Sequence, residues 1–155
     1  MQFLVAFLSL PFYIGLWGFL NIYIRNIGAL IYLSFQIFLV LTSISNPGVV
    51  TKNYYLENYK ADKTVIKNFR ICRKCNIVMD LDKGTEHCVE CGICIMNNDH
   101  HCPWISKCVG KKNLWLFNCF LVSLGAHILY LVFALVSLAV YSARINKKSN
   151  KIIKL

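Results

Sequence analysis

The sequence has few charged residues and very few acids. Only 15% of its 155 residues are charged, and Asp and Glu together number 7 against 17 Lys and Arg. A soluble domain has about 25% charged residues. The low charge, together with 57% apolar residues and a mean hydropathy of +0.51, therefore excludes an ordinary soluble domain. Disordered, collagen-like and coiled-coil chains are excluded by the same composition. The net charge of +10 favours anionic lipid headgroups or a phosphorylated ligand, and we expect no nucleic-acid partner.

Charge is missing altogether from three long stretches, residues 3–24, 27–44 and 114–141. A helix needs about 20 apolar residues to cross a bilayer core. We therefore predict a first transmembrane helix with a short loop over residues 1–26, a second at 27–45, a third at 114–141 and a basic tail at 142–155. The alternative for the first stretch is a secretory signal peptide. A signal peptide needs a positively charged n-region, and here only Met1-Gln2 precedes the apolar run. It also needs a small-residue cleavage signal after the run, and none follows.

The segment between the second and third spans differs from them in composition. Asn46-Pro47-Gly48 is predicted to end the second span, since the residue before Pro avoids the α region. Residues 46–113 hold all 7 acids and all but one of the 8 cysteines. Basic residues near the membrane are balanced between the two sides, so the positive-inside rule does not decide the topology. Thiols stay reduced in the cytosol, so we expect the cysteine-rich segment to be cytosolic and the basic tail to lie across the membrane.

The cysteines and histidines are arranged in a metal-binding pattern. The chain runs Cys72-x2-Cys75-x11-His87-Cys88-x2-Cys91-x2-Cys94-x4-Asp99-His100-His101-Cys102-x5-Cys108. Two thiolates at Cys-x2-Cys spacing reach one ion from a single turn, which is typical of structural zinc sites. The alternative, a disulfide framework, does not explain the interleaved histidines. Few large apolar residues lie between 72 and 108, so the metal would supply most of the stability.

A ligand count leaves two residues over. Two tetrahedral Cys3His sites use six cysteines and two histidines, and one Cys and one His remain. Such a remainder can form a nucleophile and its base. His100-His101-Cys102 is where we expect that pair, with Asp99 placed to orient an imidazole. A membrane ubiquitin ligase of the RING type also uses two zinc ions, but it expects a closing Cys-x2-Cys pair that this chain lacks.

The motif Asp99-His100-His101-Cys102, followed by Pro103-Trp104, Cys108-Val109-Gly110, Asn113 and Phe117, resembles the DHHC-type protein S-acyltransferases, the palmitoyltransferases. The resemblance covers residues 72–117, and the flanking spans match the family's order of two helices, domain and third helix. It implies a mainly α integral membrane protein of three predicted transmembrane helices. A small zinc-stabilised cysteine-rich domain would lie between the second and third.

The resemblance also implies roles for the site residues. Cys102 would take a fatty acyl chain, palmitoyl above all, from acyl-CoA as a thioester and pass it to membrane-proximal cysteines of protein substrates. His100 would be the base and Asp99 its orienting residue. One structural zinc ion would bind Cys72, Cys75, His87 and Cys94, and the other Cys88, Cys91, His101 and Cys108. The implied location is a multi-pass position in an endomembrane, ER or Golgi, with the domain cytosolic.

Three departures from the family pattern bear on these expectations. Residues 76–86 contain Lys83 as their only basic group, whereas the family usually has Pro and Arg there, and this weakens the case for tight CoA binding. We assign the CoA phosphates to Lys83, Lys107, Lys111 and Lys112. The alternative for the last three is a basic rim that contacts anionic lipid. Ser106-Lys107 stands where the family commonly has Asn-Asn. The fourth helix of the family is missing, so we expect a chain truncated before that helix. The alternative function is a zinc-organised membrane adaptor or inactive pseudoenzyme. His127, inside the third span, is expected to pack between helices beside the small Gly125 and Ala126.

Overall fold

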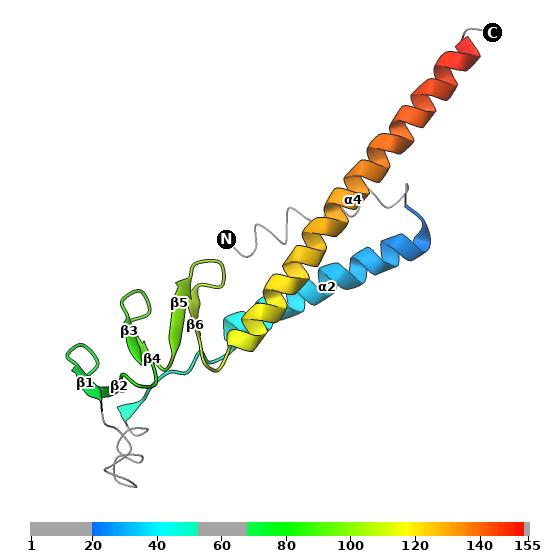
Figure 1. The fold of residues 1–155 in the computed structure, drawn as a ribbon. Helices are drawn as coiled ribbons and strands as arrows, with labels where there is room; N and C mark the ends of the chain where they lie inside the picture. The colour runs from blue at the N-terminus through cyan, green and yellow to red at the C-terminus, as the bar shows by residue number, and fades with distance from the viewer. Residues whose placement is uncertain (1–19, 53–67, 154–155) are drawn as a thin grey trace. The chain divides into compact units, whose positions relative to one another are not determined.

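A computed structural model of the chain describes residues 20–52 and 68–153 (Figure 1). Along the described chain, helix α2 comes first, six short strands follow, and helix α4 comes last. The chain divides into two compact units. One holds the described residues up to Ile37 and those from Phe120 onward, and the other holds the described residues from Phe38 to Cys119.

Helix α2 covers Ile22–Ile44 and has 23 residues, about 35 Å at 1.5 Å per residue. It begins earlier than the sequence predicts, because the expected loop through residue 26 is helical. The Asn21 carbonyl accepts a hydrogen bond from Arg25 N (3.0 Å), and its side chain accepts one from Tyr23 N (3.0 Å). Asn is a favoured N-cap residue, so the helix begins directly after it. Most of the first predicted span falls on residues 1–19, which lie outside the described residues.

Helix α4 covers Leu114–Ile153 and has 40 residues. The sequence analysis places the third span at residues 114–141 and a basic tail after it, and in the structure the basic segment continues the same helix beyond the apolar stretch (Figure 1). Residues 142–153 contain no Gly or Pro to stop it, and cations are favourable near a helix C-terminus. Within the described ranges, α2 and α4 are the two helices long and apolar enough to cross a membrane.

A small aromatic cluster joins α2 and α4 in the first unit. The His127 ring, 3% exposed, stacks on Phe35 with centroids 5.4 Å apart and lies 5.7 Å from Tyr32. His127 is therefore a packing residue, as the sequence analysis expects. The close contact between the helices is made at Gly28, however, and not at Gly125. A Cβ on Gly125 would meet nothing within 4 Å, whereas a Cβ on Gly28 would overlap the ring of Tyr130.

Gly28→Leu should therefore destabilise the helix pair. We expect a loss of about 1–3 kcal/mol from overpacking against Tyr130, seen as a lower thermal midpoint of the detergent-solubilised chain. The matched control is Gly125→Leu, where the added side chain has open space. Equal midpoints for the two variants would contradict the close approach at Gly28.

The second unit consists mainly of three antiparallel hairpins. β1 (Phe69–Cys72) pairs with β2 (Ile77–Asp80), β3 (Glu86–Cys88) with β4 (Ile93–Ile95), and β5 (Asn98–Cys102) with β6 (Lys107–Gly110). Each connection contains a residue at positive φ, namely Asn76 (51°), Gly92 (67°) and Ser106 (52°). Isolated two-stranded hairpins are marginal in water, so further contacts must hold these three together.

The segment after α2 is one such contact. The Asn46 side chain accepts hydrogen bonds from Gly48 N (2.8 Å) and Val49 N (2.9 Å), which forms the turn that the sequence predicts at the helix end. Beyond it, Val50 N donates to Cys94 O and Met96 N donates to Gly48 O, both at 2.9 Å. The chain therefore runs from the end of α2 directly onto β4.

Candidate functional site

The first Cys/His cluster joins the first two hairpins. Its ligand atoms come from Cys72, Cys75, His87 and Cys94, and all lie within 4.8 Å of one another. His87 Nδ1 lies 3.6, 3.3 and 3.7 Å from the three sulfur atoms. In a tetrahedral zinc site, sulfur and nitrogen ligands stand about 3.6 Å apart, given Zn–S of about 2.3 Å and Zn–N of about 2.0–2.1 Å. The spacing fits a tetrahedral metal ion.

The second cluster joins the second and third hairpins in the same way. It is formed by Cys88, Cys91, His101 and Cys108, again within 4.8 Å. His101 Nδ1 lies 3.6, 3.3 and 3.6 Å from the three sulfurs. The two clusters contain the same eight residues that the resemblance implies. The β3–β4 hairpin contributes to both clusters, because Cys88 and Cys91 of the second lie between His87 and Cys94 of the first.

Strand pairing explains how the ligands converge. His87 lies opposite Cys94 in the β3–β4 register, and His101 lies opposite Cys108 in the β5–β6 register. Directly opposed residues project from the same face of a sheet. Each such pair therefore supplies two ligands, and the Cys-x2-Cys turn of the preceding hairpin supplies the other two.

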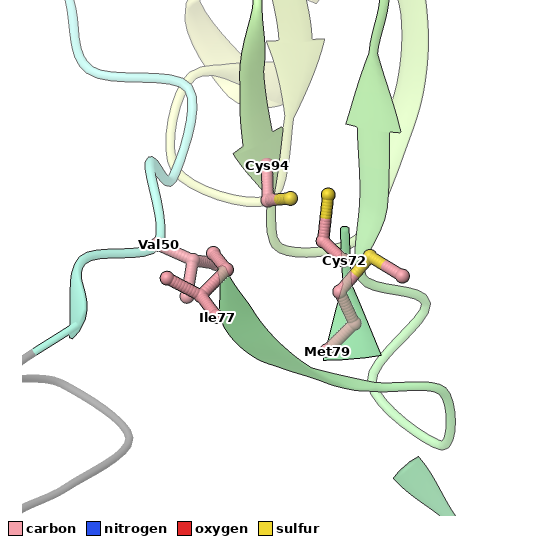
Figure 2. Packing of buried hydrophobic residues seen from close by; sticks show 5 residues of the cluster. All are labelled: Val50, Cys72, Ile77, Met79 and Cys94. Carbon is pink, nitrogen blue, oxygen red and sulfur yellow. The ribbon is translucent and has the colours of Figure 1, made fainter. Parts of the chain in front are cut away.

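The clusters are also the cores of the second unit. Cys72 and Cys94 pack with Val50, Ile77 and Met79 in one buried group. Figure 2 shows the sulfur atoms of Cys72 and Cys94 close together beside the Val50 and Ile77 side chains. With so little hydrocarbon buried, a metal ion would have to hold these hairpins together.

The electrostatics of the clusters also fit a cation. Burial raises the pKa of the Cys94 thiol and of the Cys108 thiol above the usual range. The Cys75 backbone N–H instead lowers the pKa of Cys72 through a hydrogen bond. Three thiolates packed this closely repel one another unless a cation lies between them. A divalent ion supplies that charge, so the donor set, the distances and the burial agree.

Strand β5 carries the proposed nucleophile on the face opposite its metal ligand. Side chains alternate along a strand, so His101 faces the second cluster while His100 and Cys102 share the other face. Neither His100 nor Cys102 belongs to a cluster. Cys102 is 4% exposed, and His100 is exposed with its ring 5.2 Å from that of Phe117 in an edge contact.

A β-bulge brings Asp99 and His100 together. The register passes from Asn98↔Gly110 directly to His100↔Val109, which leaves Asp99 as the extra residue. Neighbouring side chains on a regular strand point to opposite faces, and a bulge redirects one of them. Asp99 Oδ2 consequently lies 3.3 Å from His100 Nδ1. This is the contact by which a carboxylate orients an imidazole.

The four lysines assigned to CoA phosphates are not equivalent. Lys83 Nζ pairs with Asp80 Oδ2 at 3.2 Å, and Lys107 Nζ donates to Ser45 O at 2.9 Å. Lys111 and Lys112 are exposed. The structure therefore gives Lys83 and Lys107 intramolecular partners, whereas Lys111 and Lys112 are accessible to a ligand.

Asn113 connects the second cluster to α4, a role that the sequence analysis did not assign. The side chain is fully buried. It donates to Cys108 O (3.1 Å) and accepts from Gly110 N (2.8 Å), while its carbonyl accepts from Phe117 N (3.0 Å). An Asn directly before the apolar run at Leu114 is an N-cap signal that could have indicated this position.

Asn113→Ala should loosen strand β6. The Gly110 N–H and the Cys108 carbonyl would each lose a buried partner, at about 1–3 kcal/mol per group. Hydrogen exchange of the β6 amides should accelerate in this variant. Asn118→Ala, at an exposed position of α4, is the control, and the same acceleration in both variants would rule out the connecting role.

The two clusters, the Asp-His pair and the cysteine next to it define a class of protein. It is a membrane protein whose small cysteine-rich domain has two candidate metal sites and carries, on one strand, a cysteine and a histidine that belong to neither site. Residues 65–155, more than half of the chain, match the family model of the DHHC palmitoyltransferases. The chain belongs to this family.

Individual relatives agree with the family match. The chain is 35% identical over 95 residues to Palmitoyltransferase ZDHHC4 of Mus musculus, which covers 58% of this chain and 26% of that protein. It is 33% identical over 91 residues to Palmitoyltransferase ZDHHC9 of Homo sapiens, at 58% and 24% coverage. With Palmitoyltransferase ZDHHC18-A of Danio rerio, identity is 28% over 128 residues, at 68% and 27%. The chain spans about a quarter of the length of these curated relatives.

Proposed function

We propose that the chain is a protein-cysteine S-acyltransferase that moves a fatty acyl chain, palmitoyl above all, from acyl-CoA to cysteines of membrane-associated proteins. One observation carries the proposal. The Asp99–His100 contact of 3.3 Å lies on the same strand as Cys102, a thiol outside both metal clusters. The family match and the names of the relatives support the same activity.

The reaction exchanges one thioester for another. His100 takes the proton of Cys102, and the Cys102 thiolate attacks the carbonyl carbon of acyl-CoA. The bond from that carbon to the CoA sulfur breaks, and CoA leaves with the proton from the imidazolium. His100 then takes the proton of a cysteine in the protein substrate, and the resulting thiolate attacks the carbonyl carbon of acyl-Cys102. The bond from that carbon to the Cys102 sulfur breaks, and the released Cys102 thiolate takes the proton back from the imidazolium. No oxidant or reductant is needed.

The spacing on β5 supports this division of work. Residues two apart on a strand are separated by about 7 Å and share a face, so His100 and Cys102 are close enough for proton transfer once the imidazole turns toward the sulfur. Asp99, hydrogen-bonded to Nδ1, leaves Nε2 as the nitrogen that exchanges the proton. An adjacent carboxylate also stabilises the imidazolium that forms.

We assign zinc to both clusters. Three thiolates and one imidazole make a closed set of four ligands, as in structural zinc sites. Cys72, Cys75, His87 and Cys94 would hold one ion, and Cys88, Cys91, His101 and Cys108 the other. The ions would fix the strands that carry Asp99, His100 and Cys102, and would take no part in the acyl transfer.

The remaining assignments concern the membrane and the co-substrate. The exposed Lys111 and Lys112 are separated from α4 by Asn113 alone, and they can meet the CoA phosphates there as point charges. Lys83 and Lys107 would first have to leave their present partners. The uncharged part of α2, residues 26–44, is about 28 Å long. That length suits the thin ER bilayer, so we place the protein in the ER or Golgi with the hairpin unit in the cytosol.

The proposal is tested by complete acyl transfer. The chain, embedded in lipid nanodiscs, is incubated with labelled palmitoyl-CoA and a membrane-anchored peptide that carries one cysteine. We expect the label on the peptide, released by hydroxylamine as a thioester is. A metal-loaded chain that labels neither itself nor the peptide would favour a zinc-organised adaptor instead.

A further inference from the structure

We propose that Lys107 is a positioning residue, which fixes the turn end of the Cys102 hairpin to the C-terminal end of α2. The inference rests on the proposed acyltransferase function, because its purpose is to hold the nucleophile in place. Lys107 stands where the family commonly has Asn, so this connection is a feature of the present chain rather than of the family motif.

The register places Lys107 next to the nucleophile. Cys102↔Lys107 is the last pair of the β5–β6 ladder before the turn, and directly opposed residues share a face at about 5 Å between Cβ atoms. The Lys107 ammonium donates to Ser45 O at 2.9 Å across 62 residues of sequence. A single side chain thus connects the strand opposite Cys102 to the residue after α2.

The end of α2 needs such a donor. The last carbonyls of a helix have no intrahelical partner, and a cation there is favourable. Helix α2 has no basic residue in its own last turn. Hydroxyl groups of Thr42, Ser43 and Ser45 bond to carbonyls further back in the helix. Lys107 supplies the missing cation from another element.

The other end of the hairpin is held by main-chain contacts. Lys112 N donates to Pro47 O at 3.3 Å, and a Cβ on Gly110 would lie 2.5 Å from the same oxygen, so the strand end fits closely against the segment after α2. The turn end has more space. An open pocket of about 330 Å³ lies there, lined by the end of α2 and the segment after it, the β3–β4 hairpin, Ser106 and Lys107. Without the Lys107 bond, the hairpin turn could move into this space.

The experiment compares Lys107→Met, which removes the donor, with Lys107→Arg, which keeps one. Lys52→Met, at an exposed site, is the matched control, and zinc content checks that each variant is folded. Two quantities are measured: the self-acylation rate of Cys102 as a function of palmitoyl-CoA concentration, and the N-ethylmaleimide labelling rate of Cys102 without acyl-CoA, followed by peptide mass spectrometry.

For Lys107→Met we expect a maximal self-acylation rate about tenfold lower, with the half-saturating palmitoyl-CoA concentration within about twofold of the original. Maleimide labelling should become about fivefold faster, because the buried Cys102 gains exposure. Lys107→Arg should keep the self-acylation rate and the maleimide labelling rate close to those of the original chain, since arginine keeps a charged donor. Lys52→Met should match the original chain.

Two results would overturn the proposal. One is an unchanged maximal rate with a higher half-saturating concentration, which would make Lys107 a phosphate ligand. The other is unchanged maleimide labelling in Lys107→Met. If the original chain takes no acyl group at all, the proposed function fails, and the labelling comparison alone decides the role of Lys107.

Discussion

Cys102→Ser is expected to abolish self-acylation and acyl transfer while leaving the metal content unchanged. A hydroxyl at this position lacks the nucleophilicity of a thiolate, so the rate should fall by about 10³-fold or more. Both clusters are complete without Cys102, and two zinc ions per chain should remain. The checks are incorporation of labelled palmitate and elemental analysis of the same samples.

Matched variants separate the nucleophile from a general effect of cysteine loss. Cys119→Ser removes the cysteine of α4, which is outside both clusters, and should keep the original rate. His100→Ala should lower the rate by about 10²–10⁴-fold, the usual contribution of a general base, again with two zinc ions. Loss of zinc in Cys102→Ser, or full activity in that variant, would contradict the division between ligands and nucleophile.

Removal of the second metal ion should have the largest structural effect. Cys108 is completely buried and belongs to the cluster that joins the β5–β6 hairpin to the rest of the unit. Binding of structural zinc contributes about 10–16 kcal/mol in small peptides, which is comparable to the whole stability of many domains. We therefore expect Cys108→Ser to release one zinc ion, to expose the β5–β6 amides to hydrogen exchange and to abolish acylation.

A cysteine variant of the first cluster is the matched comparison for Cys108→Ser. Cys72→Ser should also release one zinc ion, but the exchange should rise mainly in β1 and β2, since β5 and β6 remain held by the second cluster. Chelation of both ions should expose all three hairpins, and added zinc should reverse the change. The same exchange pattern in both cysteine variants would contradict the separate assignment of the two ions.

Sequence spacing predicts that the cysteines and histidines gather into clusters that could hold metal ions, for a physical reason. Cys-x2-Cys is a local constraint, because two thiolates in one turn reach the same ion whatever the surrounding fold. The count of ligands leaves a Cys and a His over, but spacing alone cannot say which. The resemblance supplies the grouping, and the opposed pairs His87↔Cys94 and His101↔Cys108 explain it.

Helix ends are predicted less well. Hydropathy identifies residues suited to lipid, whereas a helix ends where capping and backbone geometry end it. Arg25 interrupts the apolar pattern but not the helix, since Asn21 caps it on the N-terminal side. The cations after residue 141 likewise change the solvent preference of α4 without stopping it.

Contacts between distant residues are beyond a reading of local patterns. The hydrogen bond between Lys107 and Ser45 joins residues 62 apart in the sequence, and the residues around either one do not indicate that the two are in contact. The bulge at Asp99 is similar, because it depends on how β5 pairs with β6. A run of Asp, His, His and Cys shows which groups are present, and only the register shows which of them share a face.

The most direct test of the acyl-enzyme mechanism is intact-protein mass spectrometry of the detergent-solubilised chain after incubation with palmitoyl-CoA. We predict an increase of one palmitoyl mass, removed by hydroxylamine and absent in Cys102→Ser. A chain that holds two zinc ions and shows no adduct, or an adduct that persists in Cys102→Ser, would contradict Cys102 as the acyl-accepting nucleophile.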